Sequence, residues 1–155
     1  MRVAGIDPGV SGAIALIDDS ERIVADLPTV SVGTTKQVDP VALSQLLGAW
    51  APERVVIEDN RANGGNGSIA NFSMGLSMGL CIAVISLGGY PLIRCKPQEW
   101  QRSVGLATVP AKQRKPASAM RARELFPALA PTLQRVADHN RAEALLIAEH
   151  GRRMG

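Results

Sequence analysis

Apolar residues come in short runs over the first third of the chain, and each run ends at turn-forming residues. The runs predict β-strands at 2–6, 13–17 and 22–26. Pro8-Gly9 and Asp18-Asp19-Ser20 supply the turns between them. Short strands joined by tight turns indicate an antiparallel meander.

A helix and a buried strand follow the meander. Asp39 has the position of a helix N-cap and Pro40 suits a first turn. Apolar residues then recur at helical spacing as far as Trp50. The β-branched run 54–57 predicts a parallel strand reached by this crossover, and it ends at Glu58.

The rest of the chain predicts mostly helices. Helices are predicted over 68–89, from Lys96-Pro97 through Trp100, over 117–126, and from Asn140 or Arg141 to about 152. Between them we expect a loop over 61–68, a strand over 90–95, a basic loop over 109–116 and a break over 127–131. Gly75, Gly79 and Ala83 recur every four residues, which predicts close approach of another element to that helix.

This order of elements predicts a single domain over 1–155 of the α/β class. It matches a ribonuclease H-like fold, a mixed five-stranded sheet flanked by helices. In that arrangement the first strand is central, the fourth lies beside it, and the last helix packs across both. Asp7, Glu58 and the start of the last helix are therefore expected to converge.

Composition narrows the class of protein. A chain of 155 residues with 46% hydrophobic and 20% charged residues suits one globular domain. We expect no membrane span, and we expect a cytoplasmic location because no charged leader precedes an apolar segment. Cys81 and Cys95 are isolated and lie in apolar runs, which predicts buried, reduced thiols.

The net charge of +3 is unevenly distributed, and its distribution favours an acidic partner. Between 94 and 123 there is one acidic residue, Glu99, against eight basic ones: Arg94, Lys96, Arg102, Lys112, Arg114, Lys115, Arg121 and Arg123. A solvated helix face is the alternative explanation.

The converging carboxylates predict a metal site. Mg²⁺ prefers oxygen ligands and binds through a few carboxylates together with substrate phosphates. Two such ions can activate a water and stabilise the leaving oxygen of a phosphodiester. Taken singly, Asp7 could cap a turn, Glu58 could end a solvated strand, Asp138 could be a helix N-cap, and Glu143 could lie on a helix surface.

Several segments together resemble the RuvC-type Holliday junction resolvases, and specifically the RuvC-like crossover junction nucleases of phages and prophages. The matching segments are GIDPGVSGAIAL, VVIEDN, NFSMGLSMGLCIAVISLGGYPLIRCKPQEWQRSVGL, RARELFPAL and DHNRAEALLIAEHG. The resemblance implies a homodimeric endonuclease that uses two Mg²⁺ ions, or Mn²⁺, and nicks branched DNA: a Holliday junction, fork or flap. It also implies 5′-phosphate and 3′-hydroxyl products.

The resemblance assigns Asp7 to both metals, Glu58 to completing the site, and the acids before the last helix to the second ion. Bacterial RuvC has an acid three residues before the position of Glu143, where this chain has Asn140. We therefore expect Asp138 to act with Glu143, with His139 as second choice.

DNA contacts are expected from four basic residues, Arg61, Lys112, Arg114 and Lys115. Bacterial RuvC has an aromatic residue where this chain continues with Arg61 and a glycine-rich loop. Phe72, further on, is expected to pack against the sheet, and Trp100 to lie in the core or at a dimer surface.

Two other classes of protein compete with this interpretation. An actin-like nucleotide-binding protein also uses an Asp-x-Gly turn, but it needs a second phosphate loop that this chain lacks. A catalytically weak or silent DNA-binding module would keep the fold, and Asn140 in place of an acid is its support. A ribonuclease H would share the metal chemistry.

Overall fold

The computed structural model describes residues 1–60, 65 and 67–155. Its strands are β1 (Val3–Asp7), β2 (Ala13–Ile17), β3 (Arg22–Asp26), β4 (Thr29–Val32), β5 (Thr35–Val38), β6 (Arg54–Glu58) and β7 (Leu92–Cys95). Its α-helices are α1 (Pro40–Trp50), α2 (Ser68–Leu87), α3 (Pro97–Ser103), α4 (Arg114–Leu125) and α5 (His139–Arg153). Three 3₁₀ turns, η1 (Ala111–Gln113), η2 (Pro127–Leu133) and η3 (Val136–Asp138), connect the later helices.

Five strands form the main sheet in the order β3-β2-β1-β6-β7. The first three are antiparallel neighbours, whereas β6 and β7 run parallel to β1. The predicted meander, the central first strand and the parallel strand beside it are confirmed, and with them the ribonuclease H-like class of fold.

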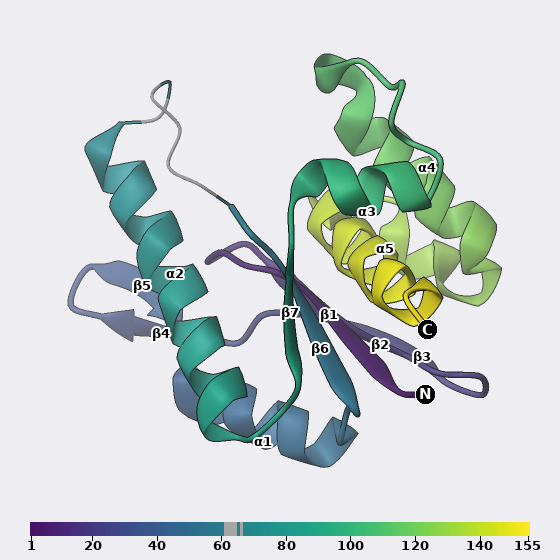
Figure 1. The fold of residues 1–155 in the computed structure, drawn as a ribbon. Helices are drawn as coiled ribbons and strands as arrows, with labels where there is room; N and C mark the ends of the chain where they lie inside the picture. The colour runs from purple at the N-terminus through teal and green to yellow at the C-terminus, as the bar shows by residue number, and fades with distance from the viewer. Residues whose placement is uncertain (61–64, 66) are drawn as a thin grey trace.

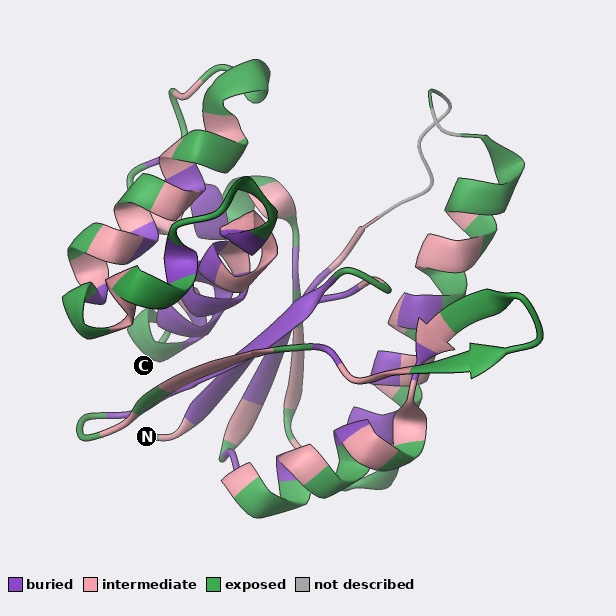
Figure 2. Ribbon diagram, turned by 180° about the vertical axis from the view of Figure 1, so that it is seen from behind, coloured by how far each residue is buried: buried purple, intermediate pink, exposed green. Residues whose placement is uncertain are grey.

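Two helical layers cover the sheet. Helices α1 and α2 lie on one face and α3, α4 and α5 on the other (Figure 1). Buried residues lie on the strands and on the helix sides that face them, while the outer helix sides are exposed (Figure 2). Alternate residues of β1 therefore enter different cores: Val3 packs with α5, whereas Ala4 and Ile6 pack with α1 and α2.

Local signals account for most helix boundaries. The Asp39 carboxylate accepts hydrogen bonds from the backbone N–H groups of Val41 and Ala42, so the predicted cap of α1 is confirmed. Two expectations about local secondary structure are wrong. A second sheet, the β4-β5 hairpin, lies where no strand was expected. The expected basic loop over 109–116 instead holds η1 and the start of α4.

Helix α2 departs most from expectation. Among the described residues it is long and apolar enough to cross a membrane by length and composition alone, contrary to the expectation that no such segment exists. Length and composition alone do not make it a membrane span: Cys81, Val84 and Ile85 pack against the rest of the protein, although only 22% of its apolar window is buried there. Outside the backbone of α2 itself, no described atom lies within 4 Å of a side-chain carbon placed at Gly75 or Gly79, so the expected close approach of another element does not occur among the described residues.

Candidate active site

Asp7 and Glu58 end two neighbouring parallel strands. Ile6 pairs with Ile57, so the two acids follow side by side at the carboxyl edge of β1 and β6. Val3 and Val56 belong to the core beneath α5, and alternation places Asp7 and Glu58 on that same face. Both carboxylates are buried, at 9% and 8% exposure.

Helix α5 brings Glu143 to the same edge because it lies directly on β1. A side-chain carbon at Gly5 would clash with the backbone of Ala144 and Ala148, so only glycine permits this contact. Glu143 immediately precedes Ala144 and is half-buried. The structure therefore brings together three of the acids that the sequence singled out.

The three carboxylates act on one another electrostatically. Burial and the nearby charges of Glu58 and Glu143 raise the pKa of Asp7 well above its ordinary value. Burial raises the pKa of Glu58 to about 7, with Glu143 adding to the effect. Burial also raises the pKa of Glu143. Each acid is therefore costly to ionise until a cation offsets the charge.

Lys115 supplies one positive charge at this site. It lies in the first turn of α4 and lowers the pKa of both Asp7 and Glu143, acting against their burial. The sequence indicated Lys115 only as a contact for the DNA backbone. Its effect on two acids follows from the packing of α4 on α5, which the sequence pattern does not reveal.

Trp100 was missed as a residue of the site. It is buried in the core, as expected, but its indole N–H donates a hydrogen bond to Oε2 of Glu58 over 2.6 Å. The Asn60 side chain also hydrogen-bonds to Glu58, and both contacts lower the pKa of that carboxyl. In the sequence, the position of Trp100 one helical turn after Lys96-Pro97 indicates only that it lies on a short helix. It does not indicate a hydrogen bond to Glu58.

The structure does not bring Asp138 into this group. Its carboxylate accepts hydrogen bonds from the backbone N–H and the guanidinium of Arg135, both over 2.8 Å. Arg141 lies 4.0 Å from it, and the charge of Asp138 acts on Asp26. The charges that act on Asp7 come from Glu58, Glu143 and Lys115.

His139 and Asn140 occupy the first turn of α5. Nδ1 of His139 lies 2.8 Å from the backbone carbonyl of Val136, which favours the tautomer with a free lone pair on Nε2. The Asn140 amide hydrogen-bonds to the backbone carbonyl of Ser11, beside the turn after Asp7.

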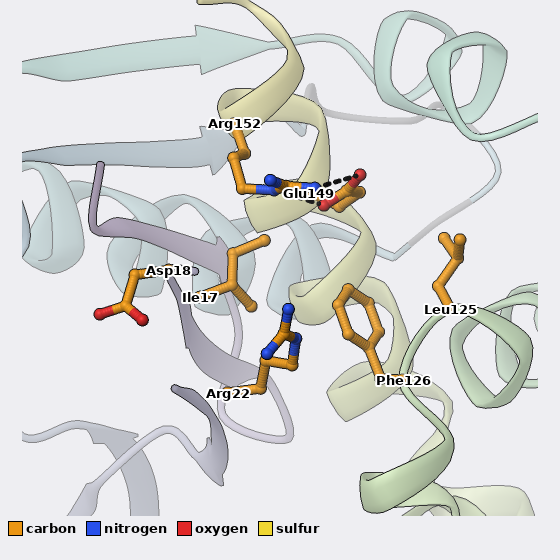
Figure 3. A pocket seen from close by; sticks show the side chains of 7 residues that line it. All are labelled: Ile17, Asp18, Arg22, Leu125, Phe126, Glu149 and Arg152. Atoms are coloured by element: carbon orange, nitrogen blue, oxygen red, sulfur yellow. Dashed lines mark hydrogen bonds and ion pairs between the residues drawn. The ribbon is translucent and has the colours of Figure 1, made fainter. Parts of the chain in front are cut away.

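Two cavities flank that turn. One, of about 340 Å³, lies between Asp7, the turn and the first half of α2. The other, of about 460 Å³, lies between the turn, Asp26 and Arg135. A smaller cavity of about 100 Å³ lies near Ile17, at the opposite end of the sheet, where Arg152 pairs with Glu149 (Figure 3).

The remaining predicted DNA contacts have varied placements. Lys112 lies on η1 and Arg114 begins α4, with Nε bonded to the carbonyl of Val109. Arg61 lies outside the described residues.

Phe72 is 73% exposed, so the expectation that it packs against the sheet is wrong. It lies on the solvent side of α2 because Ser77, Cys81, Val84 and Ile85 occupy the buried side.

Asp7, Glu58 and Glu143 offer the oxygen ligands that a hard divalent cation prefers. Charges within this group raise the pKa values of Asp7 and Glu58, and Lys115 offsets only part of the acidic charge, so a bound cation would stabilise the ionised forms. Among residues 1–60, 65 and 67–155, no three His, Cys, Asp or Glu side chains form a ready cluster for one ion. Burial raises the pKa of Cys81 and Cys95 to about 12, so these thiols do not add to the donors.

No protein-family model and no curated protein matches the sequence. Solved structures do match its fold. RuvC of T. thermophilus in complex with a Holliday junction substrate is 18% identical, with all of this chain and 97% of that chain covered and a TM-score of 0.65. A second structure, of Thermus thermophilus RuvC, is also 18% identical, with a TM-score of 0.64 and the same coverage of both chains. The yeast mitochondrial Holliday junction resolvase Ydc2 is 14% identical over 96% of this chain and 78% of its own, with a TM-score of 0.58. The chain therefore has the RuvC fold, as its sequence resemblance predicted.

Proposed function

We propose that this protein is a metal-dependent nuclease that nicks Holliday junctions or other branched DNA. The observation that carries the proposal is the meeting of three partly or fully buried carboxylates, Asp7, Glu58 and Glu143, at one edge of a RuvC-type sheet. A structural neighbour was solved with a Holliday junction substrate, which supports the class of substrate.

In the proposed site the charges of Glu58 and Glu143 both act on Asp7, so Asp7 would serve both ions, with Glu58 and Glu143 completing the ligand set. Two Mg²⁺ ions, or Mn²⁺, would supply an activated water and stabilise the leaving oxygen. With the 3′ oxygen as the leaving group, the products would be 5′-phosphate and 3′-hydroxyl ends. Lys115 offsets part of the acidic charge before a cation binds.

The fourth donor is proposed to come from the start of α5. Asp138 was the first choice from the sequence, but its ion pair with Arg135 occupies both carboxylate oxygens. His139 has the bonded Nδ1 that metal-binding histidines commonly show, which supports it as the alternative. Asp138→Asn and His139→Ala, compared for cleavage, separate the two.

DNA would approach over η1 and the start of α4, where Lys112, Arg114 and Lys115 offer charge to phosphates in sequence-independent contacts. Arg61 remains a further candidate from the sequence alone.

A homodimer is proposed through the outer face of α2. Phe72, Leu76 and Leu87 are exposed there, and Gly75 and Gly79 leave room for a second backbone. The buried, free Cys81 and Cys95 support a reducing, cytoplasmic location.

Cleavage of labelled DNA tests the proposal. Purified protein is incubated with a four-way junction, a fork and a linear duplex in Mg²⁺ and in Mn²⁺. We expect nicking of the branched substrates, and loss of nicking in Asp7→Asn with junction binding retained. Equal cleavage of linear duplex would restrict the proposal to a nuclease without structure selectivity.

A silent DNA-binding module of the same fold is the second candidate. It is favoured by Asn140 in place of an acid and by the lack of a ready cluster for one ion among the described residues. Tight junction binding without cleavage in either metal would establish it.

A further inference from the structure

Trp100 and Glu58 form a buried hydrogen bond between two elements. The indole Nε1–H on α3 donates to Oε2 of the acid that ends β6, over 2.6 Å. Trp100 is 1% exposed and Glu58 8%. We infer that Trp100 is a positioning residue that fixes the orientation of the Glu58 carboxylate toward the metal site, an inference that rests on the proposed function.

The indole itself has little freedom to move. It is among the largest fully buried side chains and packs in the core beneath α5 together with Cys95, Val104 and Leu106. A ring packed on both faces points its N–H in one direction, because interiors are close-packed.

Helix α3 is also fastened to α5. The hydroxyl of Ser103 donates to the backbone carbonyl of Trp100 over 2.8 Å and lies 3.0 Å from Nδ1 of His150. Arg153 donates to the backbone carbonyl of Ser103. The same helix that carries Glu143 therefore also holds the residue that orients Glu58.

A carboxylate needs such a partner because its terminal torsion is broad. Glutamate χ3 has no sharp minima, so an unrestrained carboxylate samples many orientations. The indole and the Asn60 side chain occupy two of about four lone-pair directions on the two oxygens and leave others for a cation. Trp100 donates as a neutral group, so it orients the acid without neutralising the charge that attracts the metal.

The local sequence is suited to this role. Pro97 begins α3, and the Glu99 carboxylate accepts a hydrogen bond from the backbone N–H of Lys96 over 2.7 Å. This cap sets where the helix starts and places Trp100 one turn along it, where its indole reaches Glu58 at the end of β6. The segment KPQEW thus has a function that its apolar pattern does not reveal.

Trp100→Phe tests the inference, because phenylalanine keeps an aromatic ring but lacks the N–H. Trp50→Phe is the matched control, since Trp50 lies at the end of α1 on the other face of the sheet. Single-turnover cleavage of a four-way junction is followed across a Mg²⁺ titration, and junction binding is measured separately in Ca²⁺.

We expect Trp100→Phe to lower the cleavage rate or raise the half-saturating Mg²⁺ concentration by about 10- to 100-fold, the usual range for partners of metal ligands. Junction affinity and the Trp50→Phe variant should match the wild type. Wild-type metal dependence and rate in a folded Trp100→Phe would overturn the inference.

A second readout needs neither cleavage nor a substitution at Trp100. The chain has two tryptophans, so a ¹⁵N-labelled sample gives two indole N–H signals. In metal-free protein, Glu58→Ala should shift the Trp100 signal and leave that of Trp50 in place, and Mn²⁺ should broaden the Trp100 signal of the wild type more than that of Trp50. An unshifted Trp100 signal would refute the contact. If the wild type cleaves nothing, the proposed function fails, and these signals alone decide the inference.

Discussion

The side-chain amide of Asn140 donates a hydrogen bond to the backbone carbonyl of Ser11, and thereby ties the first turn of α5 to the turn that follows Asp7. A carboxylate has no hydrogen to donate to that carbonyl. The departure from the acid of bacterial RuvC at this position therefore has a structural explanation, in which Asn140 holds the turn.

Asn140→Asp is expected to weaken that turn. The variant loses the donor and sets a negative oxygen against the Ser11 carbonyl, so the free energy of unfolding should fall by about 1 kcal/mol, with reduced cleavage. Urea denaturation and junction cleavage measure the two effects. Gln134→Glu, an amide-to-acid change at an exposed position, is the control. Faster cleavage by Asn140→Asp would instead identify the position as a metal ligand.

Asp138→Asn should act on stability more than on catalysis. The carboxylate binds the guanidinium of Arg135 through a charge-assisted bond of 2.8 Å, and the amide would lose that charge. We expect a lower Tm and a cleavage rate close to that of the wild type at saturating Mg²⁺. Abolished cleavage with an unchanged Tm would restore Asp138 as the fourth donor.

Stability in EDTA should fall as the pH rises. The folded-state pKa of Glu58 is raised from 4.5 to about 7, so between these values the folded protein keeps a proton that the unfolded chain has lost. This lowers the free energy of unfolding by up to about 3 kcal/mol from pH 4.5 to pH 7. Asp7 and Glu143 face Glu58 and their raised pKa values act with the same sign, against the charge of Lys115.

Chemical denaturation of the wild type and Glu58→Gln at pH 5 and pH 8 checks this expectation. The variant should lose less stability over the range. His150, whose pKa is lowered mainly by burial, contributes in the opposite sense below pH 6.5 but equally in both proteins. An equal pH dependence in the two proteins would contradict the raised pKa of Glu58.

Lys115 and Lys112 should differ in what they control. Lys115→Met removes a charge that lowers the pKa of Asp7 and Glu143, so both pKa values should rise in the variant. Cleavage near pH 7 should then fall by about tenfold for each unit of that rise, because less of each carboxyl is ionised. Lys112→Met should weaken junction binding and reduce the slope of log affinity against log salt concentration by about 1, the value for one lost phosphate contact. The maximal cleavage rate should stay unchanged. Identical effects of the two variants would contradict a separate role for Lys115.

Gly79→Glu should separate dimer formation from protomer stability. A Cβ at position 79 meets no described atom outside the backbone of α2, and glutamate favours a helix over glycine by about 0.5–1 kcal/mol. We expect a monomer in sedimentation at unchanged or higher Tm. Val41→Asp, a charge placed on the exposed side of α1, should leave the dimer intact. A dimer that survives Gly79→Glu would exclude this face of α2.

The sequence predicts the main sheet well because its strands are marked locally by turns, and the parallel strand is marked by its β-branched run. The missed β4-β5 hairpin also carried a signal: alternating residues flank Gly33, whose φ of +61° suits a tight hairpin turn. The start of α4 was missed because Pro116 suggests a loop. A proline is tolerated there since the first N–H groups of a helix have no helical partner.

The site was predictable only in part. Asp7 and Glu58 follow from strand order, and Glu143 from the packing of the last helix. The partners of these acids do not, because the bond from Trp100 to Glu58 and the pairing of Asp138 with Arg135 depend on side-chain directions that periodicity does not encode. The small-residue spacing indicated close approach at Gly75 and Gly79, whereas among the described residues the backbone of a helix comes closest to a strand glycine at Gly5.

The contact of α5 with Gly5 controls how close Glu143 comes to Asp7. Backbone rests on backbone there, so the helix has no side-chain layer that could compress or repack. A single methyl group at position 5 would lift α5 from β1 and draw Glu143 away from Asp7. The spacing of two carboxylates from opposite ends of the sequence is thus set by a residue that carries no functional group at all.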